Sequence, residues 1–204
     1  MKISDLIKHS LEAADRKEVN QALLLVCLAV DGTSKKAYPS TQKVGERYKI
    51  FINDYLDIIE LMVGGLNLQE TVFPFPDSRG NVGLSFADII YEKLRCNLAH
   101  GNELPAGYGI TVQTIENQQH FEIDILGQSM TLPQSVIYAL GIACVLSPVN
   151  SDQNIGNTQY YYRDPINSYV IDRWWGKAAC AREIMDFESQ IRVKLNFDNV
   201  WPTT

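Results

Sequence analysis

One arginine and one histidine stand five positions apart in the segment YEKLRCNLAHGN, residues 91–102. Together, Arg95 and His100 are residue types that can cleave a phosphodiester bond in RNA. A histidine with a pKa near neutrality can exchange a proton with the 2′-hydroxyl or with the leaving oxygen. An arginine supplies a fixed bidentate cation for the phosphate as its charge develops. This chemistry requires neither a metal ion nor another cofactor.

The same two residues also have a purely structural interpretation. His100 falls in the last turn of an expected helix, where the exposed carbonyls favour positive charge, and Arg95 follows Glu92 at ion-pair spacing. Five residues turn by about 140° on an α-helix, so joint catalysis needs a loosened last turn or a second subunit. Asn97 shares a helical face with His100, and its amide could orient the imidazole.

The composition predicts one soluble domain over residues 1–204. The chain is 46% hydrophobic and 21% charged, which is typical of a globular protein. Its longest strictly apolar run, ALLLVCLAV, is less than half of the roughly 20 residues that span a bilayer, so we expect no membrane association. Acidic residues interrupt the first twenty positions and argue against a secretory signal. These features predict a cytoplasmic protein.

Charge and cysteine spacing narrow the function classes further. The net charge of −6 argues against a broad nucleic-acid surface but leaves room for a small basic cleft. The four cysteines are scattered singly, with no Cys-x-x-Cys pair and no nearby histidine. We therefore expect mostly buried free thiols, with no metal site and no cofactor.

Hydrophobic periodicity predicts a mainly α protein, a bundle of about six helices. The first helix opens near Ile3, and the second runs from about Glu18 to Asp31 with Gly32 as its stop. The third is a long helix through residues 44–62, which the Gly64-Gly65 pair ends. Residues 66–84 are expected to form a long loop. Ser85 then caps a fourth helix that ends at Gly101.

The period changes after residue 108. Alternating β-branched and polar residues predict a β-hairpin of residues 110–115 and 121–126, with a turn at 116–119 and a third strand left open. This hairpin forms an insertion at about residues 108–132, between helices four and five. Pro133 is expected in the first turn of the fifth helix, and a last helix is predicted from about Ser168 to near Leu195.

The central segment resembles the signature of the HEPN superfamily of helical domains. That signature is an arginine, four to six residues, then a histidine that glycine commonly follows. Here Arg95, the four residues 96–99, His100 and Gly101 fit it. The earlier stretch LAVDGTSKKAYPSTQKVGERYKIFINDYL is also similar to bacterial members, and the likeness covers roughly residues 18–146.

The resemblance implies a metal-independent endoribonuclease of the toxin or phage-defence kind that acts as a homodimer. In such proteins the arginine and histidine of two subunits line one cleft, so Arg95 would bind the scissile phosphate of RNA and His100 would transfer a proton. Active members usually carry Asn, Asp or His directly after the arginine, whereas this chain has Cys96. Asn97 is the candidate to substitute for that residue.

Two alternatives to the nuclease stay open. The first is a non-catalytic HEPN-type module that binds a nucleotide, RNA or a protein partner. The second is a regulatory subunit paired with a partner such as a nucleotidyltransferase antitoxin. The segment QYYYR, residues 159–163, could stack unpaired bases beside a phosphate or could simply pack a loop onto the bundle.

Overall fold

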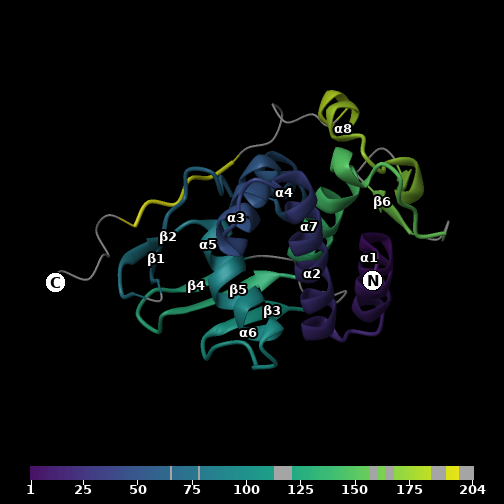
Figure 1. Ribbon diagram of the computed structural model, residues 1–204. Helices are drawn as coiled ribbons and strands as arrows, with labels where there is room; N and C mark the ends of the chain where they lie inside the picture. Colours follow the sequence, from purple (N-terminus) through teal and green to yellow (C-terminus); the bar gives the residue numbers. More distant parts are fainter. Residues whose placement is uncertain are drawn as a thin grey trace.

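A computed structural model describes residues 1–64, 66–77, 79–112, 121–156, 160–163, 168–184 and 192–197. Helices fill the centre of the molecule, and small sheets lie around them (Figure 1). The predicted helical core is therefore confirmed, but the molecule is mixed α/β and contains more strand than one inserted hairpin. None of the described helices is both long and apolar enough to cross a membrane.

The first two helices, α1 (Ile3–Asp15) and α2 (Val19–Ala37), pack side by side. The prediction that α2 stops at Gly32 is wrong. A Cβ atom at position 32 would lie 2.4 Å from Cδ1 of Ile3. Gly32 therefore lets the two helices approach closely, and the helix continues through it.

The predicted long third helix is interrupted. It forms α3 (Val44–Asp54) and α4 (Leu56–Val63), separated at Tyr55, whose φ of −113° and ψ of 13° depart from helical values. Gly64, with a φ of +75°, ends α4 as predicted.

The predicted loop after α4 contains an antiparallel hairpin. Strand β1 (Phe73–Pro76) pairs with β2 (Val82–Leu84), and Phe73 stands opposite Leu84. Both of these side chains are buried. The two prolines of β1 concealed the strand, because proline is normally confined to sheet edges.

The predicted fourth helix begins at Ser85, whose Oγ accepts a hydrogen bond from the backbone N of Asp88 at 3.1 Å. It consists of three consecutive segments: α5 (Phe86–Asp88), the π-helix η1 (Ile89–Arg95) and α6 (Cys96–Ala99). The N–H of Cys96 bonds to the carbonyl of Tyr91, which is the five-residue spacing of a π-helix. The sequence did not predict this widened turn.

The predicted pairing of the two strands after residue 108 is wrong. Strands β3 (Tyr108–Thr111) and β4 (Glu122–Asp124) do not pair with each other but flank β5 (Ser129–Pro133), parallel and antiparallel respectively. A third strand, β5, is thus present at the centre of the sheet, and its Met130 and Leu132 are buried in the core. The predicted turn at 116–119 lies outside the described residues.

Helix α7 (Ser135–Leu146) confirms the predicted fifth helix. It is buried along almost its whole length and packs against α2 and α4 (Figure 1). Pro133 ends β5 instead of opening this helix. Pro148 follows at the start of a short 3₁₀ turn, η2 (Pro148–Asn150).

The predicted last helix is wrong at both ends. Its start is strand β7 (Ser168–Val170), which pairs with β6 (Tyr161–Arg163), followed by the 3₁₀ turn η3 (Ile171–Arg173). Helix α8 (Ala178–Ile184) begins only after Gly176, whose φ is +76°. Residues 185–191 lie outside the described residues, and residues 192–197 are not helical, with Val193 bridging to Leu66.

Candidate active site on the central helix

Arg95 is held by a carboxylate from another helix. Its Nε and Nη2 both donate to Oδ2 of Asp31 on α2, at 2.8 and 2.5 Å. The two side chains are only 17% and 16% exposed. Burial alone would lower the pKa of the Arg95 guanidinium, but the bond to Asp31 and its charge raise the pKa above the ordinary value. The group is therefore cationic at neutral pH.

The geometry of this pair leaves one edge of the guanidinium unused. Asp31 occupies the edge formed by Nε and Nη2, the Cys96 sulfur also interacts with the guanidinium, and Nη1 donates to no oxygen of the described residues. A guanidinium can bind a second oxyanion through its two terminal nitrogens. Asp31 thus fixes the orientation of Arg95 without filling all of its donor sites.

Tyr91 lies one helical turn before Arg95 and contacts two cations. Its ring centroid is 5.6 Å from Cζ of Arg95 and 5.6 Å from Nζ of Lys49 on α3. The ring also packs against the backbone of α3, because a Cβ atom at Gly45 would lie 2.7 Å from it. Tyr91 therefore joins α3 to the π-helix beside the candidate site.

Lys49 extends the ionic contacts along the same face. Its Nζ lies 2.6 Å from Oδ1 of Asp88 and 2.8 Å from Oε1 of Glu92. With Arg95 and Asp31, these residues form an ion-pair cluster of two cations and three carboxylates. The cluster ties the π-helix to both α2 and α3, and its carboxylates outnumber its cations.

Asn97 serves its own helix. Its Nδ2 donates to the carbonyl oxygens of Lys93 and Glu92, at 2.9 and 3.3 Å. These bonds occur where the π-helix returns to α-helical spacing, a change of register that leaves a carbonyl without its regular donor. The side chain thus stabilises the segment that carries Arg95 and His100, and no hydrogen bond from its amide nitrogen to the imidazole is seen.

His100 lies at the end of α6 and is exposed to solvent. Within the described residues, no hydrogen bond or ion pair joins its side chain to Arg95. Residues 96–99 are α-helical, so the two side chains leave the helix in different directions, as the five-residue spacing predicts. One chain alone does not bring the predicted catalytic pair together.

The Cys27 thiol, buried beneath the site, is not activated. Burial raises the pKa of the Cys27 thiol to about 12, and Cys96 is half-buried directly after Arg95. Thiols of such high pKa are unreactive at neutral pH. Over the described ranges, no group of three or more His, Cys, Asp or Glu side chains is placed to hold a metal ion.

The sequence singled out Arg95, Asn97 and His100 as candidates but did not point to Asp31 and Tyr91, which contact Arg95. Asp31 stands 64 positions before Arg95, so no local spacing relates them. The available signal was a lone carboxylate at the end of the apolar run ALLLVCLAV. A charge beside such a buried segment is commonly paired.

The chain resembles proteins of mycobacteria over almost its full length. It is 30% identical to the uncharacterized protein Rv1289 of Mycobacterium tuberculosis (strain ATCC 25618 / H37Rv), in a match that covers 98% of this chain and 95% of the relative. The uncharacterized protein Mb1320 of Mycobacterium bovis matches with the same identity and coverage. No solved structure gives a significant match. A family model named Rv1289 matches residues 2–201, and the chain therefore belongs to the Rv1289 family.

Proposed function

We propose that this chain is a HEPN-type, metal-independent endoribonuclease that cleaves RNA with Arg95 and His100 as a cytoplasmic homodimer of the toxin or phage-defence kind. The observation that supports this proposal most is the orientation of Arg95. Asp31 binds one edge of the guanidinium and leaves the terminal edge for a second oxyanion. A phosphate in the RNA backbone fits that edge, since its oxygens accept two parallel hydrogen bonds.

The reaction divides between the two residues. The 2′-oxygen of the ribose attacks the adjacent phosphorus, and the bond from phosphorus to the 5′-oxygen breaks. His100 takes the proton of the 2′-hydroxyl or protonates the leaving oxygen, and solvent water exchanges the other of these two protons. Arg95 stabilises the charge on the phosphate. The products are a 2′,3′-cyclic phosphate and a free 5′-hydroxyl.

The exposure of His100 fits a site shared between subunits. Arg95 and His100 diverge within one chain, so in this proposal each Arg95 acts with the His100 of a second copy. Asn97 is then a positioning residue, because its bonds to the carbonyl oxygens of Glu92 and Lys93 hold the helical turn that carries Arg95.

The test is cleavage of a mixed-sequence fluorescent RNA in EDTA. The wild type is compared with the Arg95→Ala and His100→Ala variants at matched concentration and mass by light scattering. His9→Ala is the control, since His9 is also exposed but lies on α1. We expect only the first two variants to lose cleavage; retention of cleavage by His100→Ala would overturn the proposal.

A second candidate is a non-catalytic module that binds RNA, a nucleotide or a protein partner such as a nucleotidyltransferase antitoxin. The composition of the ion-pair cluster favours the protein-partner form of this candidate: three carboxylates surround two cations, which weakens attraction for a phosphate but not for basic side chains of a protein. In the same assay, a wild-type dimer that binds RNA but releases no fragments would support this candidate.

A further inference from the structure

A cavity of about 350 Å³ lies on the side of α7 that faces α1. This volume is within the range of small-molecule sites, which is roughly 300–1,000 Å³. Apolar side chains at helical spacing form its walls: Ile7 and Leu11 from α1, and Ile142 and Val145 from α7. The cavity is separate from the ion-pair cluster around Arg95, because none of its lining residues belongs to that cluster.

Three tyrosines line the polar part of the cavity: Tyr138, Tyr160 and Tyr161. The hydroxyl of Tyr160 donates to Oδ2 of Asp15 at 2.9 Å, and the hydroxyl of Tyr138 accepts from Nε2 of Gln134 at 2.9 Å. Because both hydroxyls have protein partners, the rings of these two tyrosines remain as the surface that a ligand can contact. Aromatic rings attract cations through their electron-rich faces.

The electrostatics at this end of the cavity are negative. Asp15 is the last residue of α1, where the helix dipole places partial negative charge. Arg16, the residue after Asp15, is engaged by Glu18 at 2.8 Å. Burial, then the hydrogen bond to Asp15, then the charges of Asp15 and Glu12 raise the pKa of the Tyr160 hydroxyl to about 12.

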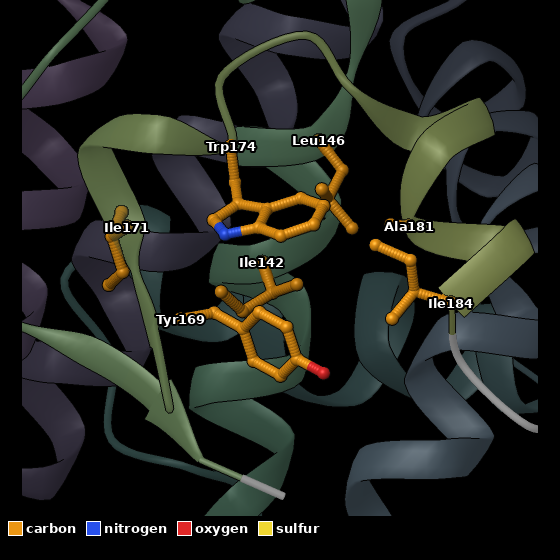
Figure 2. Close-up of a pocket in the computed structure, with 7 residues that line it drawn as sticks. All are labelled: Ile142, Leu146, Tyr169, Ile171, Trp174, Ala181 and Ile184. Atoms are coloured by element: carbon orange, nitrogen blue, oxygen red, sulfur yellow. The ribbon is translucent and has the colours of Figure 1, made fainter. Parts of the chain in front are cut away.

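The apolar lining continues beyond the cavity. Ile142 and Ile171 also border a recess of about 20 Å³ in which the rings of Tyr169 and Trp174 meet edge to face, with centroids 5.3 Å apart (Figure 2). All of the side chains that line this recess offer apolar surface. An apolar substituent of a ligand in the cavity would thus meet apolar side chains.

We propose that this cavity binds a small organic cation that carries an apolar group, with the cation between the tyrosine rings and Asp15. A carboxylate next to aromatic rings favours a substituted ammonium over a neutral or anionic molecule, because the charge and the ring faces attract it together. The Ile and Val side chains of α1 and α7 receive the apolar group. This binding function is independent of RNA cleavage.

The test uses benzyltrimethylammonium as the probe and the full-length protein in isothermal titration calorimetry. Benzenesulfonate, which has a similar ring and the opposite charge, is the ligand control. Asp15→Asn removes the charge but keeps an oxygen that can accept from Tyr160, and Tyr138→Ala removes a ring. Glu70→Gln is the matched control, since Glu70 is an exposed acid that does not line the cavity.

We expect benzyltrimethylammonium to bind at one site per chain and benzenesulfonate not to bind. Asp15→Asn and Tyr138→Ala should each raise Kd by about fivefold, whereas Glu70→Gln should leave it unchanged. Circular dichroism checks that the variants are folded. The proposal is overturned if the wild type shows no saturable binding, if benzenesulfonate binds as well, or if folded Asp15→Asn retains the wild-type Kd.

Discussion

Asp31 decides which edge of the Arg95 guanidinium is open. One carboxylate oxygen of Asp31, Oδ2, accepts both hydrogen bonds from Arg95. The other oxygen, Oδ1, is buried without a hydrogen-bond partner in the described part of the chain. A buried carboxylate oxygen without a donor costs free energy. The ion pair with Arg95 therefore compensates for the burial of the Asp31 side chain. In the proposed enzyme Asp31 is therefore a positioning residue.

The first prediction concerns Asp31→Asn. The amide keeps the shape of the side chain but loses the charge that orients Arg95, so we expect kcat for RNA cleavage to fall about tenfold. KM should not rise, because the local charge becomes more positive. Steady-state kinetics measure both values, and Asp31→Glu should recover part of kcat. An unchanged kcat for Asp31→Asn would show that Asp31 does not position the arginine.

At this scale the sequence pointed to the residues of the proposed chemistry but not to their partners. Arg95 and His100 are visible from their types and spacing. The contact of Arg95 with Asp31 joins α2 to the π-helix across 64 positions and depends on how the helices pack. The amide of Asn97 was expected near the imidazole, and the structure uses it instead on the backbone of η1.

At the scale of elements, α3 and the π-helix approach each other closely at Gly45. Gly45 lies against the ring of Tyr91, and there is no room for a Cβ atom between them. The contact brings Lys49 of α3 to Asp88 and Glu92. The packing of these two helices thus determines the geometry around Arg95.

The second prediction is that Gly45→Ala destabilises the protein by about 1–3 kcal/mol, because the added methyl group forces the Tyr91 ring or α3 to move. Urea unfolding measures the change. Gly141→Ala is the matched control: it is also a helical glycine, but its Cβ atom would lie at ordinary contact distance, 3.8 Å, from Ile7 and Val26. The fit is disproved if the two substitutions have the same effect.

The third prediction concerns Asp88. Burial alone would raise the pKa of its carboxyl group, but the bonds from Lys49 and Ser85 outweigh burial and lower the pKa below 3.8. A lowered pKa in the folded state stabilises the protein above the unfolded pKa, and this contribution is lost as pH falls through the folded value. Asp88→Asn should therefore cost about 1 kcal/mol at neutral pH.

This cost should shrink as the pH falls below 3.8, the ordinary pKa of an aspartic acid side chain, because the wild-type carboxyl group then becomes neutral as well. Urea unfolding of both proteins across this range measures the difference. A cost that does not change with pH would mean that the charge of Asp88 contributes nothing to stability.

The elements were predicted where local periodicity controls them. The apolar pattern located α1, α2 and α7, and Ser85 marked the start of α5. The pattern could not show that Tyr55 interrupts the third helix, since the apolar positions continue through it in register. The pairing of the strands could not be predicted either, because alternation of polar and apolar residues identifies a strand but not its neighbours. In the structure β5 pairs with both β3 and β4.

At the scale of the whole molecule, a connected set of buried side chains runs through the helices and reaches the sheets. Its density around α2 and α7 explains why these helices are apolar on nearly every face. The Arg95–His100 segment lies at the end of the continuous helix formed by α5, η1 and α6. One side of this segment packs on the core, and His100 is accessible to solvent. This placement leaves the site complete only with a second copy, according to the proposed mechanism.

The fourth prediction tests that shared site. Arg95→Ala and His100→Ala proteins are each inactive, but subunit exchange between them creates mixed dimers in which one site has both residues. Equal mixing should restore about a quarter of the wild-type activity, because half of the dimers are mixed and half of their sites are intact. The measurement is RNA cleavage before and after exchange. If no activity returns although exchange occurs, both residues of a site come from one chain.

The most direct measurement for the proposed chemistry is single-turnover cleavage of one RNA in EDTA, beside the same RNA with a 2′-deoxy sugar at the cleavage position. Wild-type protein should cleave the first to a 2′,3′-cyclic phosphate and a 5′-hydroxyl, and should leave the second intact. Arg95→Ala and His100→Ala should cleave neither. Cleavage of the 2′-deoxy substrate at the same rate, or undiminished cleavage by His100→Ala, would contradict the mechanism.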